Sequence, residues 1–184
     1  MRKTMVERKT KETDIKVELN LDVRGENKIE TGIGFFDHML NLMAFWGDMT
    51  LNVKCVGDLW IDGHHTVEDV GICIGKAIAQ AFGDKKGINR YGSARTPMDE
   101  CLATVDMDIS NRPYLVFNAD VKDELVQEFF QALAFNAGIT LHINLLYGKN
   151  EHHKAECIYK TFGFALKQAV KKSSDTIQST KGMI

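Results

Sequence analysis

The sequence His64-His65-Thr66-Val67-Glu68 returns as His152-His153-Lys154-Ala155-Glu156, and these two copies of an HHxxE motif contain four of the chain's six histidines. Each copy is followed by a long segment with helical apolar periodicity. In a helix, the first histidine and the glutamate lie on one face about one turn apart. The second histidine lies roughly 100° further round the axis. One motif can therefore offer an imidazole and a carboxylate to one metal ion and its other imidazole to a second ion.

A single histidine pair at a helix start is as easily a solvated helix end as a metal site, because short motifs often match by chance. Two copies in matching context favour ligands. The spacing also differs from the HExxH motif, in which the glutamate lies between the ligands and acts as a base. We therefore interpret Glu68 and Glu156 as metal ligands.

The composition is that of an ordinary globular protein, with 44% hydrophobic and 26% charged residues in 184, which suits one domain or two small halves packed together. The net charge of −2 without a basic stripe argues against a nucleic-acid partner. No apolar run is long enough to span a bilayer, and residues 1–11 lack the apolar core of a signal peptide. The four cysteines form no CxxC pair, so we expect reduced thiols and a cytoplasmic location without membrane contact.

Hydrophobic periodicity predicts the same order of elements twice: strand, strand, helix, strand and helix. In the first half these are residues 14–23, 28–32 as the hairpin partner, 35–46, 49–56, and a helix from the first motif to residue 82. In the second half they are residues 101–109, 114–117 pairing back, 125–137, 139–146, and a helix from the second motif to residue 170.

Matching residues support an internal duplication. Phe35-Phe36 is echoed by Phe129-Phe130, and Thr50-Leu51-Asn52-Val53 by Thr140-Leu141-His142-Ile143. The repeat predicts an α+β fold of two pseudo-symmetric halves, each a sheet with its helices gathered on one face. We expect a single domain, 1–184, with halves at about 10–90 and 91–172 and a C-terminal substrate-binding tail at 173–184. No linker composition separates the halves.

The remaining histidines are His38, at a predicted helix start after Asp37, and His142, in the middle of a predicted strand. Asp37 is placed to orient the His38 ring. A lone strand histidine is usually structural, so a ligand role for His142 depends on its proximity to the motifs. With both included, each of two ions receives three imidazoles and one carboxylate. Our hypothetical partition places His65, His142, His152 and Glu156 on one ion and His38, His64, Glu68 and His153 on the other.

Exchanging one histidine between the two ions is equally compatible with the sequence. The ligand types fit Mn, Fe, Ni or Zn. Two open positions on an octahedral ion favour Mn or Fe, whereas affinity order by itself favours Zn.

A second set of candidate residues is basic. Arg90 and Arg112 lie at predicted turns, Lys160 follows Glu156 by four residues, and the chain ends near Ser179-Thr180-Lys181-Gly182. Taken singly, each is an ordinary surface residue. Together, arginine forks, hydroxyls and backbone N–H groups can bind a phosphate.

Several stretches together resemble the imidazoleglycerol-phosphate dehydratases, and the resemblance covers nearly the whole chain. These stretches are residues 31–40, residues 57–63 with the first motif, Pro97-Met98-Asp99-Glu100, Arg112-Pro113-Tyr114, the second motif through Lys160, and Ser179-Thr180-Lys181-Gly182. The resemblance implies a fold like ribosomal protein S5 domain 2. It also implies a homo-oligomer of 24 subunits, with active sites at subunit interfaces and two Mn²⁺ ions in each site.

The resemblance implies a hydro-lyase of histidine biosynthesis that converts D-erythro-imidazole-glycerol phosphate to imidazole-acetol phosphate and water. The substrate ring, as an imidazolate between two metal ions, would help to expel the hydroxyl and form a diazafulvene-like species. Glu12, Glu68 and Glu156 are all candidates for the proton transfers. The residues expected to bind this phosphorylated imidazole are Glu12, Arg90, Arg112, Lys160, Ser179 and Lys181.

The chain departs from the family pattern at Trp46, where the family more often has histidine, and at Asn111, where it usually has glycine. Two rival hypotheses are a dinuclear metallohydrolase and a metal-storing or purely structural shell protein. The first lacks the expected bridging aspartates, and the second leaves Arg90, Arg112 and Lys181 without a role. Formation of an enolisable ketone from the substrate separates both from a dehydratase.

Overall fold

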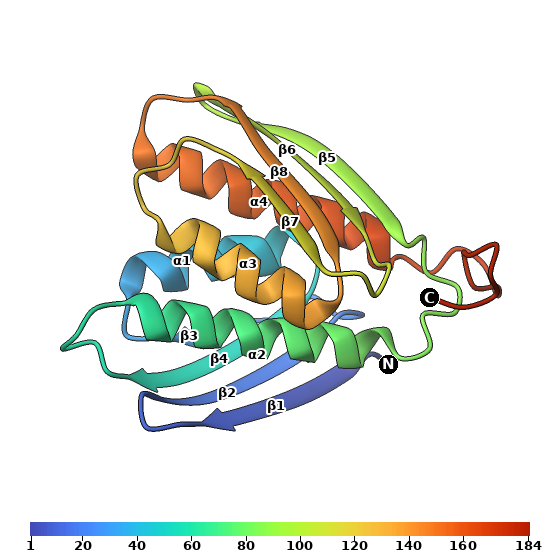
Figure 1. Cartoon of the computed structure of the whole chain (residues 1–184), viewed down its shortest axis with the longest axis horizontal. Coiled ribbons are helices and arrows are strands. Elements are labelled where there is room, and N and C mark those ends of the chain that lie inside the picture. Colours follow the sequence, from blue (N-terminus) through green and yellow to red (C-terminus); the bar gives the residue numbers. More distant parts are fainter.

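The computed structural model describes all residues, 1–184, as two similar halves that each contain a four-stranded sheet and two helices (Figure 1). The first half comprises β1 (Lys3–Lys9), β2 (Thr13–Asn20), β3 (Lys28–Glu30), α1 (Gly34–Trp46), β4 (Thr50–Gly57) and α2 (His64–Phe82). The second comprises β5 (Tyr91–Met98), β6 (Cys101–Asp108), β7 (Tyr114–Asn118), α3 (Leu125–Ala137), β8 (Thr140–Tyr147) and α4 (Glu151–Val170). The predicted α+β class and internal duplication are confirmed.

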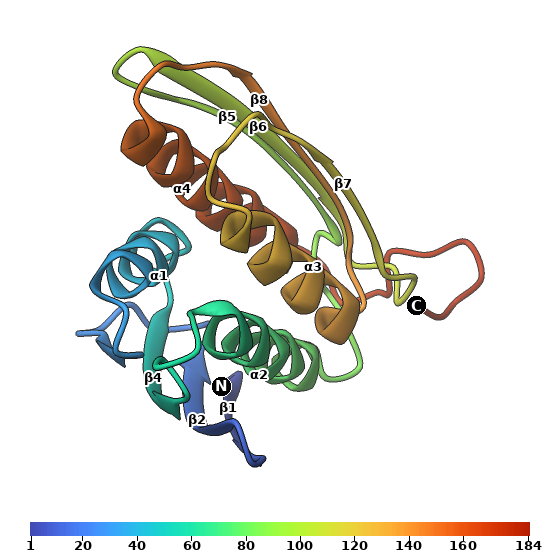
Figure 2. The same ribbon diagram turned by 60° about the vertical axis from the view of Figure 1, so that its left-hand side comes forward.

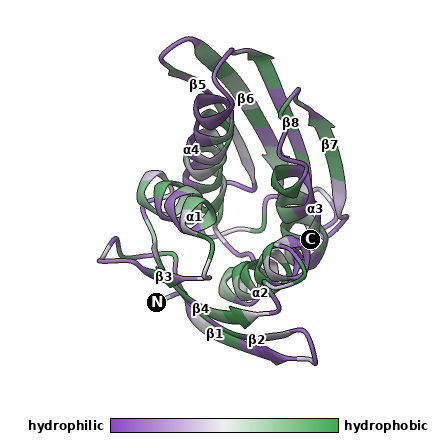
Figure 3. Ribbon diagram, turned by 90° about the vertical axis from the view of Figure 1, so that its left-hand side faces the viewer, coloured by the Kyte–Doolittle hydropathy of each residue, from purple (hydrophilic) through white to green (hydrophobic).

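The helices lie between the two sheets (Figure 2). Helix α2 packs against α3, and α1 packs against α4, so each helix pair joins the two halves. Strand residues alternate between a buried inner face and an outer face, as in β6, where Cys101, Ala103, Val105 and Met107 are buried. The alternation appears as green and purple bands along the strands in Figure 3. A single cluster of 47 buried hydrophobic residues runs through both halves, which makes them one structural unit.

Each half begins with a strand that the sequence analysis missed, β1 or β5. The β1 sequence Lys3-Thr4-Met5-Val6-Glu7-Arg8-Lys9 is mostly charged, and Val6 is its one buried side chain. A strand at a sheet edge needs little apolar surface, because it pairs on one side only. The first half therefore begins at Lys3 rather than near residue 10.

The predicted hairpins of β2 with β3 and of β6 with β7 are wrong. The sheet orders are β1-β2-β4-β3 and β5-β6-β8-β7, and β3 and β7 each pair in parallel with the strand that follows the next helix. Strand β2 already has β1 on one side and β4 on the other, so β3 adds to the free edge of β4. Parallel neighbours need a crossover connection, and α1 and α3 supply it.

Both HHxxE motifs lie at the same end of the molecule. Helices α2 and α4 start at the left in Figure 1, whereas the chain from Ser173 to Ile184 lies at the opposite end. Helix α4 has 20 residues, which corresponds to a length of about 30 Å. None of the helices combines the length and the apolar composition that a membrane crossing requires.

Arg2, directly before β1, forms an ion pair with Asp22 and a hydrogen bond with the far end of α4. Arg2 donates to Asp22 from Nε at 2.8 Å and from Nη2 at 2.7 Å, and its Nη1 donates to the carbonyl of Val170 at 2.5 Å. The hydrogen bonds from Arg2 hold the pKa of Asp22 below its usual value of 3.8. A carboxyl with a depressed folded-state pKa stabilises the protein above its unfolded pKa, and this contribution is lost as the pH falls through the folded value.

We therefore expect Asp22→Asn to lower the free energy of unfolding at pH 7 by roughly 0.5–1 kcal/mol, because the pair is partly exposed. The difference from the unsubstituted chain should shrink as the pH falls below 3.8, the usual carboxyl pKa, and should vanish only once the pH has fallen through the lower pKa of Asp22 in the folded protein. Urea unfolding at stepwise decreasing pH measures both quantities. A difference that stays constant with pH would contradict the assignment to the charge of Asp22.

Candidate active site

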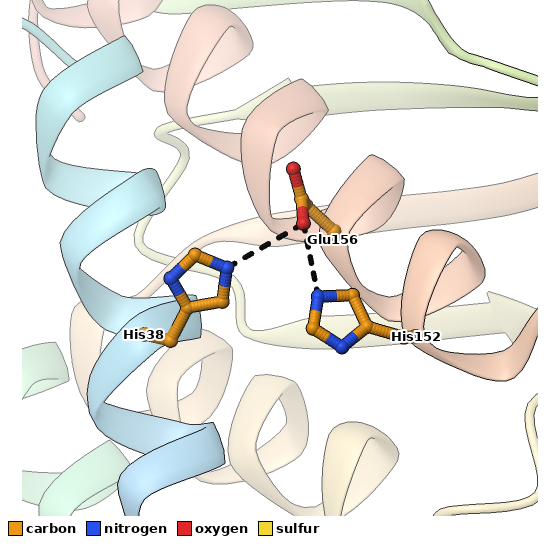
Figure 4. A group of neighbouring side chains, drawn as sticks. All are labelled: His38, His152 and Glu156. Carbon is orange, nitrogen blue, oxygen red and sulfur yellow. Dashed lines mark hydrogen bonds and ion pairs between the residues drawn. The ribbon is translucent and has the colours of Figure 1, made fainter.

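Three predicted ligands meet at the start of α4. The ligand atoms of His38, His152 and Glu156 all lie within 4.8 Å of one another (Figure 4). Nε2 of His152 is 3.2 Å from Oε2 of Glu156, one helical turn away, and Nε2 of His38 on α1 is 3.5 Å from the same oxygen. The expected i, i+4 geometry of the second motif is confirmed. Two imidazoles and a carboxylate from two helices form a group that can hold a metal ion.

Local hydrogen bonds explain how the two helix starts are held. The side chain of Asn150 caps α4 by accepting from the backbone N–H groups of His152 and His153. In the first turn of α1, Asp37 accepts from the backbone N–H of Thr31 at 2.9 Å and from the Thr31 hydroxyl at 2.5 Å. Asp37 therefore holds the loop that precedes α1, and the prediction that it orients His38 is wrong.

Glu156 is held as a carboxylate by the Lys160 ammonium and by hydrogen bonds from two histidines. Only 10% of its side chain is exposed, and Lys160 Nζ lies 2.5 Å from Oε1. Burial raises the pKa of Glu156, but hydrogen bonds from Lys160, His38 and His152 outweigh burial, so that the pKa lies below its usual value. Lys160, which was predicted to bind substrate, thus belongs to this group of side chains rather than to the basic pocket described below.

The first motif provides a smaller group. Nε2 of His64 lies 3.6 Å from Oε2 of Glu68, and both side chains are nearly half exposed. The motif's i, i+4 geometry is the predicted one. Within one chain the first motif therefore supplies two neighbouring ligand atoms at the surface.

The second histidine of each motif is held by a different carboxylate. Nδ1 of His65 lies 2.9 Å from Asp58, and Nδ1 of His153 lies 2.9 Å from Glu100. These hydrogen bonds raise the pKa of both histidines, and His153 holds the pKa of Glu100 far below its ordinary value. The Nε2 atoms face hairpin tips, with His65 at 3.8 Å from Glu12.

Asp99, on the β5–β6 tip, lies near His153 as Glu12, on the β1–β2 tip, lies near His65. Its Oδ2 lies 3.9 Å from Nε2 of His153. No pattern in the sequence indicates a role for Asp58, Asp99 or Glu100. Only Asp58 lies near its histidine in the chain; Glu100 is 53 residues away from His153, so no local spacing could have found it.

His142 lies apart from the other predicted ligands. Its strand neighbours Leu141 and Ile143 are buried, so His142 points to the outer face of the second sheet, opposite Asp106 of β6. It lines a shallow pocket of about 270 Å³ together with Tyr91, Ser93 and Asp108. One chain therefore does not bring His142 to the motifs, and it groups His38 with His152 and Glu156 rather than with the first motif as our partition assumed.

The predicted basic residues other than Lys160 surround a pocket of about 720 Å³ at the far end of the molecule. Its lining includes Arg90, Arg112, Ser179 and Lys181. Arg90 donates to Asp108 at 2.6 and 3.0 Å and to the carbonyl of Gln178 at 2.9 Å, so it fastens the tail to the sheet. Arg112 is 68% exposed at the pocket mouth.

The two departures from the family pattern have different structural settings. Asn111 has a φ of 60°, the left-handed region in which asparagine is tolerated better than most residues and glycine best. Asparagine can thus keep the turn before Arg112. Trp46, at the end of α1, packs on Phe164 with the two rings tilted at a centroid distance of 4.8 Å, and it contacts Phe45 edge-on at 5.2 Å.

The fold and this geometry define a duplicated α+β protein with histidine–carboxylate groups at the starts of its two repeated helices, the larger of them at α4. A model of the imidazoleglycerol-phosphate dehydratase family matches residues 31–166. Imidazoleglycerol-phosphate dehydratases of Acetivibrio thermocellus and Clostridium acetobutylicum are 56% and 54% identical to the chain, over 100% of it and 99% and 98% of their own lengths. The chain belongs to the imidazoleglycerol-phosphate dehydratase family, whose members are dehydratases, that is, carbon–oxygen lyases.

Solved structures agree with this assignment. The imidazoleglycerol-phosphate dehydratase of Staphylococcus aureus superimposes with a TM-score of 0.83 at 40% identity, covering 92% of this chain and 98% of its own. That of Pyrococcus furiosus gives a TM-score of 0.86 at 37% identity, covering 97% and 100%.

Proposed function

We propose that this protein dehydrates D-erythro-imidazole-glycerol phosphate to imidazole-acetol phosphate, with two metal ions, in histidine biosynthesis. The observation that carries the proposal is the convergence of His38, His152 and Glu156 on one point at a motif that the chain contains twice. A family of dehydratases supplies the reaction class. The four cysteines are free and buried, in keeping with our proposal of a cytoplasmic location.

The residues present fit Mn²⁺. Glu156 is held as a carboxylate, and His65 and His153 have Nδ1 engaged by carboxylates, which leaves Nε2 as the ligand atom. We propose that His38, His64, His65, His142, His152, His153, Glu68 and Glu156 hold two Mn²⁺ ions per site. When bound, such ions supply Lewis acidity at the ring nitrogens of the substrate and favour the deprotonated ring.

Within this site the chain's own carboxylates differ in what they can do. Glu156 is tied to Lys160 and two histidines, which suits a ligand better than a proton carrier. The Glu12 side chain is 53% exposed at a hairpin tip and lies within 3.8 Å of His65. We assign to Glu12 the transfer of a proton between the substrate's side chain and solvent. Glu68 is assigned the role of a metal ligand beside His64.

The proposed phosphate site is the basic pocket, where Arg90, Arg112, Ser179 and Lys181 supply cationic and hydroxyl donors. This pocket follows the far end of α4, about 25 Å from the second motif by helix length, which is beyond the reach of a small substrate. His142 is also separated from the motifs, because it lies on the outer face of the second sheet and the helices that carry the motifs lie on the inner side. We therefore propose a homo-oligomer in which the motifs of one subunit meet His142 and the basic pocket of neighbouring subunits. The resemblance to the family implies 24 subunits.

The test is a steady-state assay on imidazole-glycerol phosphate with the chelator-treated protein, before and after Mn²⁺ is added back. We expect no ketone product after chelation, recovery with Mn²⁺, and no recovery for His65→Ala. Glu26→Gln, on an exposed loop, is the control and should behave like the unsubstituted chain. Bound Mn²⁺ without product from the unsubstituted chain would refute the proposal in favour of metal storage.

A further inference from the structure

Asp58 is a buried carboxylate whose one side-chain partner is a histidine. The residue is 2% exposed, its Oδ2 lies 2.9 Å from Nδ1 of His65, and its buried Oδ1 has no hydrogen-bond partner. Its backbone is fixed as well, because its N–H donates to the carbonyl of Glu12 at 3.1 Å. A buried carboxylate with an unpaired oxygen costs stability. The contact with His65 therefore explains this residue better than a contribution to folding does.

Glu100 makes the corresponding contact in the second half from a different loop. Its Oε2 lies 2.9 Å from Nδ1 of His153, and its Oε1 accepts from the backbone N–H groups of Asn150 at 2.8 Å and Lys149 at 3.2 Å. Asp58 follows β4, whereas Glu100 lies on the β5–β6 tip. The duplication does not dictate this similarity, because the two carboxylates occupy different positions in their repeats.

The two contacts determine which nitrogen each ring can offer. A carboxylate only accepts hydrogen bonds, and a neutral imidazole carries one N–H, so Nδ1 must donate and Nε2 keeps its lone pair. The first histidines differ, since His64 and His152 turn Nε2 to the glutamate of their own motif. We propose that Asp58 and Glu100 are positioning residues that hold His65 and His153 so that each presents Nε2 to a different metal ion.

This inference rests on the proposed metal-dependent function, and metal affinity tests it without reference to turnover. The assembled protein is stripped of metal and titrated with Mn²⁺, with calorimetry for affinity and stoichiometry and electron paramagnetic resonance for free Mn²⁺. Asp58→Ala and Glu100→Ala are each expected to lower the affinity for one of the two Mn²⁺ ions by about 10–100-fold and to leave the affinity for the other unchanged. The double variant should bind both Mn²⁺ ions with lowered affinity.

Asp58→Asn and Glu100→Gln keep an acceptor oxygen for Nδ1, so their losses should be smaller than those of the alanine variants. Glu26→Gln removes one exposed negative charge without a contact and should leave both affinities unchanged. A graded loss of affinity for one ion alone indicates a positioning role, because a general loss of structure would lower the affinity for both ions together.

Alanine variants that bind both ions as tightly as the unsubstituted chain would overturn the inference. So would an equal loss of both ions together with a lowered thermal midpoint, which would assign Asp58 and Glu100 a purely structural role. Failure of the proposed function looks different: the unsubstituted chain would bind two Mn²⁺ ions and form no product, while the single-ion effect of each variant would persist.

Discussion

Glu156→Ala is expected to abolish turnover of imidazole-glycerol phosphate, with kcat/KM lowered by about 10³-fold or more, since a catalytic metal contributes several kcal/mol. Three groups converge on this carboxylate: His38 at 3.5 Å, His152 at 3.2 Å and Lys160 at 2.5 Å. Without Glu156, the two imidazoles lose the negative charge that favours a cation between them, and Lys160 becomes an unpaired cation beside the site. The assay is run at saturating Mn²⁺, so that a lowered affinity for Mn²⁺ is not mistaken for the loss of catalysis by the metal-loaded enzyme.

The same variant tests whether a site draws on more than one chain. Coexpression of Glu156→Ala chains with Arg112→Ala chains should restore activity well above that of either variant alone, because some sites then combine an intact centre from one chain with an intact basic pocket from another. Coexpression with His152→Ala is the matched control. His152 and Glu156 belong to one group in one chain, so this mixture should stay inactive. Absence of complementation in the first mixture would place the whole site in a single subunit.

Gly75→Val is expected to have the largest effect on stability, lowering the free energy of unfolding by about 3 kcal/mol. A Cβ on Gly75 would lie 2.6 Å from the carbonyl oxygen of Leu133 and 2.8 Å from Cβ of Asn136, both on α3. One turn earlier, a Cβ on Gly71 would lie 2.9 Å from the carbonyl oxygen of Phe129. Backbone atoms yield less easily than flexible side chains do, so α2 and α3 would have to separate, and with them the two halves.

Chemical unfolding followed by circular dichroism measures this loss. Gly34→Ala is the control, because it likewise adds a Cβ to a helical glycine, but nothing lies within 4 Å of the new Cβ. It should leave stability unchanged or raise it slightly. Equal stability of Gly75→Val and Gly34→Ala would show that the close approach of α2 and α3 is not a constraint on the fold.

The sequence predicted the local elements well where periodicity is strong. The span of α3, Leu125–Ala137, and the ends of α2 and α4 agree with the predicted helices, because apolar residues at helical spacing mark the face that packs. The duplication followed from matching residues in the two halves. The strands β1 and β5 were missed, because edge strands bury few side chains and therefore lack a clear period-2 pattern.

For the candidate site, the sequence by itself determined the pairing of His64 with Glu68 and of His152 with Glu156, since residues four apart on a helix must be neighbours. Contacts between distant segments were decided only by the tertiary structure. Packing of α1 on α4 brings His38 to Glu156, and the β5–β6 tip brings Glu100 to His153. The parallel pairing of β7 with β8 required the crossover by α3. Such contacts depend on how separately formed elements pack, which short-range spacing along a chain does not encode.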